Sequence, residues 1–290
     1  MRKIIGACAI ALTFSSGLSA QTVDLRSGTS WAPSSPMIAN GGVGVKIKGV
    51  VENATVGPAS ISNAAMSVWT DPAAVTRNVT MKGLFITGAW REGIRINGTA
   101  TGVNIEDFYI SMRDVPQTND QLPSGITVLS GKNVTISRGT VSGFKTIPSS
   151  AYPNGDGIAA EKNVDTLSIS DVSSSDNTDG GFDLKSTNTR LNNLSAARNY
   201  RSYRFWGKAA ATTLTSVDPR NAHIWAGAGS EVVIDKLVAQ SKTNALILYV
   251  DGAKSVTIKA CELSVPVGTK LVYKATAASV VTLGKGCVLP

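Results

Sequence analysis

The sequence predicts an all-β protein with one domain, a right-handed parallel β-helix, which is a solenoid with a short N-terminal cap. Short runs rich in Val, Ile and Thr recur in steps of 24 residues, as at Val79 and Val103 and again at Val232, Val256 and Val280. A second kind of strand recurs between these runs, usually after a small residue. The intervening segments leave no room for a crossover helix. A chain that coils once per period and stacks each strand on its predecessor fits this pattern.

An antiparallel sandwich or barrel is the competing fold, because it also places strands about 8–12 residues apart. The regular return of the same strand pair favours the solenoid. The composition is that of a globular protein with a large core, since 42% of the residues are hydrophobic and only 17% are charged. These values exclude a disordered or collagen-like chain.

The chain begins with the features of a secretory signal at residues 1–20. A basic start is followed by an apolar stretch from Ile4 to Phe14 and by small residues before Gln21. The stretch is too short to span a membrane, and no later segment is apolar for long enough. We therefore expect a secreted or periplasmic protein without a membrane span. Residues 21–290 form the single domain, with residues 21–75 as irregular first turns and a cap over the open end.

Two cysteines remain after the predicted leader, Cys261 and Cys287, about one repeat apart. Neighbouring turns of a solenoid would bring them together as a disulfide, the alternative being two buried thiols. The net charge is +8 and becomes +6 without Arg2 and Lys3. A mildly basic secreted protein favours acidic partners. We expect an acidic polysaccharide as partner, no nucleic acid, and a monomer.

Alternation within the second kind of strand predicts which side chains face solvent. One outward column is expected to hold Arg95, Thr127, Ala159, Asp183, Arg204, His223 and Ile247. The next is expected to hold Asn97, Leu129, Glu161, Lys185, Trp206, Trp225 and Tyr249. Because stacked strands lie about 4.8 Å apart, acids, bases and aromatic rings gather on one exposed face.

Carboxylates also precede two successive strands, at Asp156 and Asp179. The two positions are one turn apart and should stack. With Asp183, and with Glu161 nearby, they form a cluster of oxygen ligands suited to a hard cation such as Ca²⁺, which would relieve their mutual repulsion. Asp-Gly turns at a solenoid corner are the alternative explanation for each single aspartate.

Two segments carry a resemblance to a known family. Asn154–Ala160 (NGDGIAA) and Asp176–Leu184 (DNTDGGFDL) resemble the calcium-site segment of the ninth family of polysaccharide lyases, which contains pectate lyases. The resemblance covers roughly residues 154–207. It implies a parallel β-helix that binds a pectate-like polymer with the help of calcium and cleaves it.

The resemblance also implies roles for single residues. Asp156, Asp179 and Asp183 become calcium ligands, although Gly180 stands where the family has the second aspartate of a pair. The lysine that abstracts the sugar proton in that family falls near Arg204. Arginine is the base in other β-helix pectate lyases.

A second resemblance, to polygalacturonases, rests on one motif. Asn177-Thr178-Asp179-Gly180 is similar to the first motif of these inverting glycosidases. Their aspartate pair one turn later corresponds to Arg201-Ser202 here, and their Gly-His-Gly motif is absent, the one histidine being His223. Hydrolysis of this kind needs two well-placed carboxylates.

Lyase cleavage removes the proton next to the uronate carboxylate and expels the 4-oxygen. Calcium or a cationic side chain would stabilise the developing enolate charge. The first candidate base is Arg204 and the second is Lys185, although lysine is deprotonated more easily and Arg204 is also suited to clamp the carboxylate bidentately. His223 is a candidate donor to the leaving oxygen. The candidate sugar-binding residues are Glu161, Trp206, Trp225 and Tyr249.

The sequence thus predicts a secreted, polysaccharide lyase-like protein that binds a uronate-containing polysaccharide and cleaves it by β-elimination. The leading alternative is a non-catalytic β-helix, an adhesin or polysaccharide-binding module, in which the same groove only grips. A uronate epimerase would use the same proton abstraction, and a polygalacturonase-like hydrolase is a further alternative. A base near a substrate carbon, with Asp156, Asp179 and Asp183 converging on a metal, would distinguish a lyase from a binding module.

Overall fold

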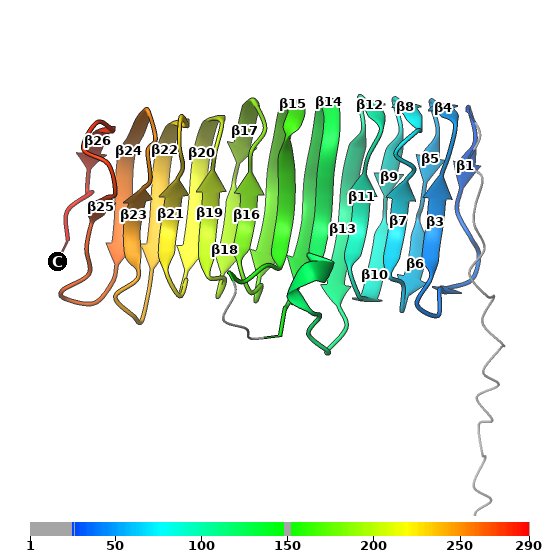
Figure 1. The fold of residues 1–290 in the computed structure, drawn as a ribbon, viewed down its shortest axis with the longest axis horizontal. Coiled ribbons are helices and arrows are strands. Elements are labelled where there is room, and N and C mark those ends of the chain that lie inside the picture. The colour runs from blue at the N-terminus through cyan, green and yellow to red at the C-terminus, as the bar shows by residue number, and fades with distance from the viewer. Residues whose placement is uncertain (1–24, 26, 148–151, 290) are drawn as a thin grey trace, which may run out of the picture.

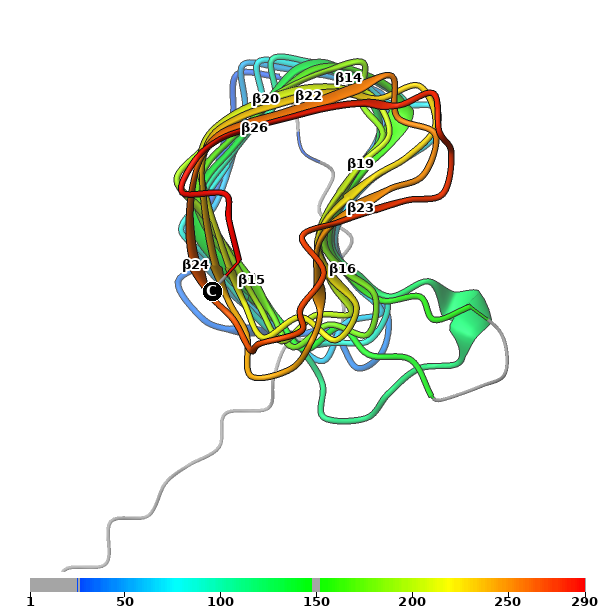
Figure 2. The same ribbon diagram turned by 90° about the vertical axis from the view of Figure 1, so that its left-hand side faces the viewer.

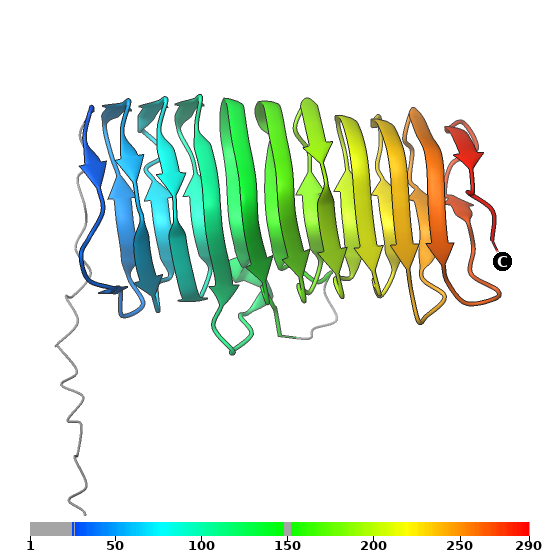
Figure 3. The same cartoon turned by 180° about the vertical axis from the view of Figure 1, so that it is seen from behind.

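The protein is a right-handed parallel β-helix, as the repeat predicts (Figures 1 and 3). The computed structural model describes residues 25, 27–147 and 152–289, so the leader predicted at residues 1–20 lies outside the described part. Within that part, 26 strands form one continuous sheet that coils upon itself. Every pairing between these strands is parallel and joins one turn to the next.

Each turn contributes to three faces of the coil, which are visible end-on in Figure 2. What we call the first face holds the strands of the second kind. Its separate strands are β3 (Val43–Ile47), β7 (Met66–Thr70), β11 (Glu92–Ile96), β16 (Gly180–Leu184), β19 (Arg201–Phe205), β21 (Ala222–Ala226), β23 (Leu246–Val250) and β25 (Val272–Lys274).

The second and third faces hold the Val- and Ile-rich runs that follow. The separate strands of the second face are β1 (Ser30–Trp31), β4 (Val50–Glu52), β5 (Thr55–Val56), β8 (Val75–Arg77), β9 (Thr80–Lys82), β12 (Thr99–Thr101), β17 (Asn188–Asn192) and β26 (Val280–Lys285). Those of the third face are β2 (Met37–Ile38), β6 (Ala59–Ser62), β10 (Leu84–Ala89) and β18 (Leu194–Ala197).

Six longer strands bend around the corners and contribute to more than one face. They are β13 (Asn104–Met112), β14 (Ser124–Ser142), β15 (Asp156–Ser175), β20 (Lys208–Val217), β22 (Glu231–Gln240) and β24 (Ser255–Ser264). Asparagine or aspartate occupies the left-handed backbone region at several bends, for example Asn133, Asp171 and Asn193. These residues tolerate that region better than most, so their recurrence explains how a strand turns a corner without glycine.

The core is a column of apolar side chains inside the coil. On the first face Ile126 pairs with Ile158 and Ile158 with Phe182, and each is fully buried. The rings of Phe182 and Tyr203 then stack at a centroid distance of 5.2 Å. Each inward side chain contacts the equivalent side chain of the next turn. The buried apolar contacts therefore stabilise each turn through its immediate neighbours.

The N-terminal part is more regular than predicted. Residues 21–75 were expected to form irregular turns, but from Ser30 onward they already make strands in register with the rest of the coil. Val43, Val45 and Ile47 supply the period-2 alternation of a β-strand, which outweighs the Pro, Ala and Ser content on which the expectation rested.

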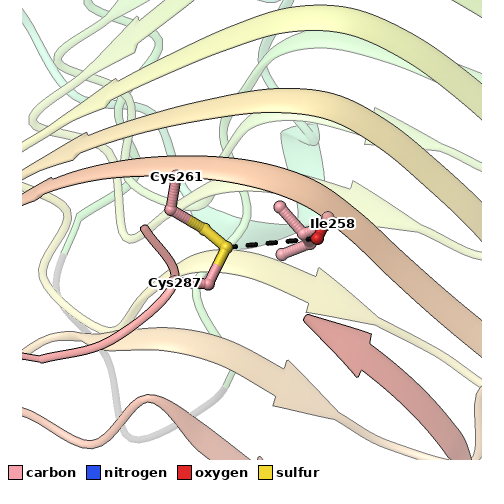
Figure 4. The surroundings of a disulfide bond; sticks show 3 residues. All are labelled: Ile258, Cys261 and Cys287. Carbon is pink, nitrogen blue, oxygen red and sulfur yellow. Dashed lines mark hydrogen bonds between the residues drawn. A yellow bond between two sulfur atoms is a disulfide. The ribbon is translucent and has the colours of Figure 1, made fainter. Parts of the chain in front are cut away.

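The disulfide expected at the other end is present. Cys261 on β24 is joined to Cys287, which follows β26 (Figure 4). The bond ties the last turn to the turn before it. In the described part of the chain, no helix is long and apolar enough to cross a membrane.

Two segments depart from the compact coil. One precedes β14 and holds a single 3-10 turn, η1 (Asn119–Gln121), and the other precedes β15. In Figure 2 both project, in green, from the coil beside the first face. They are the only large additions to the described turns, and they border the site.

Candidate active site

The candidate site lies on the first face, where the strand register lines up five outward residues. Arg95 pairs with Thr127, Thr127 with Ala159, Ala159 with Asp183, and Asp183 with Arg204. Neighbours in this column are about 4.8 Å apart. The short side chains of Thr127 and Ala159 leave a depression between Arg95 and the charged cluster at Asp183. This depression is a pocket with a volume of about 220 Å³.

The two projecting segments form the side of the pocket. Leu122 and Pro123 come from the segment before β14, and Tyr152 and Asn154 from the segment before β15. The floor is made of paired strands. The pocket is therefore bounded by a rigid sheet on one side and by loops on the other, which is the usual setting of a binding site.

Asp179 and Asp183 share one cationic partner, Arg204. The Nη1 of Arg204 lies 2.7 Å from Oδ2 of Asp179 and 3.4 Å from Oδ2 of Asp183. All three residues are less than 9% exposed. In such surroundings an ion pair is screened little by water, so the three side chains hold one another in place.

Asp183 has further donors. The indole Nε1 of Trp206 donates to its Oδ1 at 2.7 Å, and Nζ of Lys185 lies 3.5 Å from its Oδ2. Lys185 also donates to Oε1 of Glu161 at 2.6 Å. Trp206 and Lys185 of the predicted second column thus contact Asp183 of the first column. Both carboxylate oxygens of Asp183 face N–H donors.

Asp156 lies at the edge of the same cluster. Its Oδ1 accepts a hydrogen bond of 2.7 Å from the backbone N–H of Gly180. A Cβ added at Gly180 would lie 2.7 Å from this oxygen and 3.6 Å from Cβ of Asp183, so the two aspartates are neighbours across the glycine. Desolvation raises the pKa of Asp156 well above its ordinary value, and the carboxylates of Asp183 and Asp179 raise it further.

Asp179 is bound on its other side by two residues. The hydroxyl of Tyr152 donates to its Oδ1 at 3.0 Å, and Nη1 of Arg201 lies 3.5 Å from the same oxygen. Arg201 also donates to the Tyr152 hydroxyl. Burial raises the pKa of Asp179, although Arg204 and Arg201 counteract it. Neither Tyr152 nor Arg201 was among the predicted site residues.

An asparagine ladder inside the corner fixes the segment that carries Asp179. The backbone N–H of Phe144 donates to Oδ1 of Asn177 at 3.0 Å, and Nδ2 of Asn177 donates to Oδ1 of Asn199 at 2.9 Å. Both asparagines are no more than 1% exposed. The backbone N–H of Asp179 then donates to the carbonyl of Gly155 at 2.9 Å. Successive turns are thereby locked together where the acidic residues emerge.

The two predicted bases are held as cations. Burial alone would lower the pKa of Arg204, but Asp183, Asp179 and Asp156 raise it above its already high ordinary value. The pKa of Lys185 is likewise raised, because Asp183 and Glu161 outweigh its desolvation. In this arrangement both side chains are proton-bearing partners of carboxylates.

The carboxylates do not fit a calcium ion as they are arranged. Calcium takes six to eight oxygen ligands, whereas here the guanidinium of Arg204 lies against both Asp179 and Asp183. Gly180 supplies no carboxylate, and one oxygen of Asp156 already accepts a hydrogen bond from the backbone N–H of Gly180. Calcium binding by Asp156, Asp179 and Asp183 stays a prediction, and no step below depends on it.

The expected outward column is wrong beyond Arg204. Arg204 pairs with Trp225, two residues after His223, and His223 itself is 0% exposed and points into the coil. A 2.7 Å hydrogen bond joins its Nδ1 to Oγ of Ser216. Burial lowers the pKa of His223 to about 4.

The expected register of β21 was shifted by two residues, and strict alternation does not hold at the start of these strands. The equivalent residues of the preceding turns also face the interior, since a Cβ at Gly181 would lie 3.2 Å from Cβ of Ala196 and Ser202 is 0% exposed. Ile247, 0% exposed, is displaced for the same reason.

Trp225 and Tyr249 therefore belong to the first column, not the second. Trp225 pairs with Tyr249, which pairs with Tyr273. The rings of Trp206 and Trp225 lie 4.3 Å apart, and those of Tyr249 and Tyr273 lie 5.0 Å apart. An aromatic strip thus runs from the acid cluster toward the C-terminus. Trp225 is only 5% exposed, so most of the accessible surface of this strip belongs to Trp206, Tyr249 and Tyr273.

Sequence reasoning missed the residues that loops and turns bring to the pocket. Tyr152 lies outside any strand, and no periodicity points to it. Arg201 pairs with Gly180 at the start of β19, three residues before Arg204, and alternation from Arg204 does not indicate this position. Arg91 and Glu92 line the N-terminal end of the pocket in the same way, just before and at the first residue of β11.

Comparison with known proteins agrees with this architecture. The chain matches no protein-family model. No curated protein matches its sequence. Among solved structures, the Dettilon tailspike protein superposes with a TM-score of 0.64 at 14% identity, over 92% of this chain and 60% of the tailspike. The chain thus spans 60% of that protein's length.

Two further solved structures are similar. A polygalacturonase from Erwinia carotovora ssp. carotovora superposes with a TM-score of 0.61 at 14% identity, over 92% of this chain and 85% of the enzyme. The pectate lyase Pel9A has a TM-score of 0.42 at 12% identity, over 90% of this chain and 68% of the lyase. The tailspike and polygalacturonase matches agree with a right-handed parallel β-helix fold for this chain. At these identities the likeness shows the fold alone.

Proposed function

We propose that this protein binds an acidic polysaccharide along its first face and cleaves a glycosidic bond in the pocket. The observation that carries the proposal is that Asp156, Asp179 and Asp183 line one pocket in different surroundings. Glycosidic cleavage by carboxyl groups needs one that is protonated and one that is ionised. The raised pKa of Asp156 and the cationic partners of Asp183 favour such a division.

In this mechanism Asp156 is the general acid and Asp183 the general base. Asp156 gives its proton to the glycosidic oxygen as the bond from that oxygen to the anomeric carbon breaks. Asp183 takes a proton from the water whose oxygen forms the new bond to that carbon. Arg204 and Lys185 hold the carboxylate of Asp183 in place.

The surroundings of the pocket suit a sugar polymer. Trp206, Tyr249 and Tyr273 offer partly exposed rings in a line that continues from the acid cluster, and aromatic faces provide apolar contact area beside a polar edge. Without the predicted leader the net charge is +6, which favours an acidic polymer. The tailspike and the polygalacturonase support the proposal only as proteins of the same fold.

β-Elimination of a uronate polymer, which the lyase resemblance implies, is the second candidate. The observation that favours it is the guanidinium of Arg204 at the pocket, because this group is suited to neutralise a sugar carboxylate. It needs a base that gives up its own proton first. Since the carboxylates raise the pKa of both Arg204 and Lys185, hydrolysis is the better supported route.

The setting of the protein is also a proposal. A disulfide between Cys261 and Cys287 is typical of proteins outside the reducing cytoplasm, and the leader at residues 1–20 agrees with it. We therefore place the activity in the periplasm or outside the cell. That the protein acts as a monomer stays a prediction.

The test is a panel of acidic polysaccharides incubated with the mature protein, with and without chelator. New reducing ends without ultraviolet absorbance from unsaturated uronates are the expected result. Reducing ends together with that absorbance would establish elimination instead. Binding without new ends would indicate a binding module, or an epimerase if the sugar configuration changes. Loss of activity with chelator would support the calcium prediction.

A further inference from the structure

A second charged cluster lies at the N-terminal end of the pocket, around the start of β11. Arg91, Glu92 and Arg95 all line the pocket. The register Arg95 to Thr127 to Ala159 to Asp183 separates this cluster from the cleavage carboxylates by three turns. Three strand spacings amount to roughly 14 Å. The proposed cleavage mechanism uses none of these three residues.

Two members of the cluster neutralise each other. Nη1 of Arg95 lies 3.0 Å from Oε2 of Glu92, whose side chain is 4% exposed. Burial raises the pKa of Glu92, while Arg95 and Arg91 lower it. A buried carboxylate with one guanidinium partner at ion-pair distance forms a neutral pair, so the charge of Arg91 is left over.

Arg91 is a half-buried cation that the carboxylates of Glu92 and Asp120 influence through their charge but do not contact in an ion pair. It makes no ion pair or side-chain hydrogen bond within the part of the chain that the structure describes, and its Nε is buried and unsatisfied. Residues 148–151, which the structure does not describe, are Pro-Ser-Ser-Ala and contribute no carboxylate. The two terminal nitrogens of Arg91 have no hydrogen-bond partner among the described residues and are not buried, so they are the donors that a ligand in the pocket can reach.

We propose that the terminal guanidinium nitrogens of Arg91 bind a carboxylate of the polysaccharide at this end of the pocket. The planar fork of a guanidinium matches the two oxygens of a carboxylate. The sugar read here is not the one whose bond is cleaved, because the cluster lies three turns from Asp183. The inference deepens the proposed function by naming a sugar acid, a uronate, as the group that the pocket selects.

Binding measurements separate this inference from the cleavage mechanism. Asp156→Asn protein is titrated calorimetrically with trisaccharides of galacturonate, guluronate and glucuronate, and with their methyl esters. We expect at least one of the acid trisaccharides to bind. The further substitution Arg91→Gln should weaken the affinity for that acid about tenfold or more, as expected for a lost charge-assisted hydrogen bond. The ester, which carries no charge, changes less than about twofold. Arg91→Lys gives an intermediate loss, since it keeps the charge but not the fork.

Arg113→Gln is the matched control. Arg113 also has a buried, unsatisfied Nε, but its guanidinium stacks on Trp90 and it does not line the pocket. Arg113→Gln should change neither the affinity for the acid trisaccharide nor the affinity for its methyl ester. Equal weakening of acid and ester by Arg91→Gln, no weakening, or no binding of any acid trisaccharide would overturn the inference. A charge-dependent loss in a protein that cleaves no polymer would instead leave the inference standing and refute the cleavage mechanism.

Discussion

At the scale of single residues, Asp156 carries most of the proposed chemistry. Asp183 is its neighbour across Gly180, and Oδ1 of Asp156 accepts a hydrogen bond from the backbone N–H of Gly180. A carboxyl group that is desolvated and faces like charges keeps its proton at a higher pH than usual. The same environment that makes it an acid should therefore make it a source of instability when it ionises.

Replacing Asp156 by Asn tests this directly. The raised pKa means that the folded protein binds more protons than the unfolded chain at any pH between the ordinary value of 3.8 and the raised one. The stability of the unsubstituted protein should therefore fall as the pH rises through that window. Asp156→Asn lacks the titrating group, so its urea midpoint should fall less between pH 4 and pH 7. An identical fall in both proteins would contradict the raised pKa.

His223 gives the opposite pH dependence. Its pKa is about 4 in the folded protein and 6.5 when unperturbed, so the unfolded chain takes up a proton first as the pH falls. The contribution of neutral His223 to the free energy of unfolding is complete above pH 6.5. It is lost as the pH falls to 4, by up to about 3 kcal/mol. His223→Asn should remove this loss. Urea unfolding at pH 7 and pH 5 measures it, and an unchanged difference between the two pH values would show that the imidazole is not buried.

At the scale of elements, the pocket exists because short side chains interrupt an outward column. Ala159 on β15 lies between Thr127 and Asp183. Ala159→Phe should fill the depression and reduce cleavage at least about tenfold, since a bulky ring outside the coil blocks substrate without disturbing the core. Rates and thermal midpoints of the purified variants check this.

Ser168→Phe is the control for that substitution. Ser168 is an outward residue of the same strand on the second face, away from the pocket. Both variants should unfold near the temperature of the unsubstituted protein, and only Ala159→Phe should lose activity. Equal activity of the two would mean that substrate does not enter the depression.

The strands show how far the sequence alone reaches. The 24-residue step predicts the coil, and the alternation from Arg95 to Arg204 predicts the column that forms the site. The prediction fails at His223, because alternation does not hold at the start of β21: His223 and the equivalent Ser202 are both 0% exposed. Tyr152 could not be predicted, since a loop residue follows no period. The ion pair of Arg204 with Asp179 could not be predicted either, because it joins a strand to the turn before its neighbour.

At the scale of the whole molecule, the solenoid isolates the site from its ends. Each turn contacts only its neighbours, so a change in the last turn should stay there. Reducing the Cys261–Cys287 disulfide, or replacing both cysteines by Ser, should lower the local stability by about 2–4 kcal/mol. Hydrogen exchange should accelerate in β26 and leave β16 unchanged, and cleavage should be unaffected. Faster exchange reaching β16 would contradict this independence.

The most direct test of the central claim compares two aspartate substitutions on whichever polymer the panel identifies. Asp156→Asn removes the proposed acid, whereas Asp165→Asn removes an exposed carboxylate that lies outside the pocket. Release of reducing ends is the measurement. We predict that Asp156→Asn loses activity by about a hundredfold or more and still binds the polymer, while Asp165→Asn retains the full rate. Full activity in Asp156→Asn would refute the proposed site.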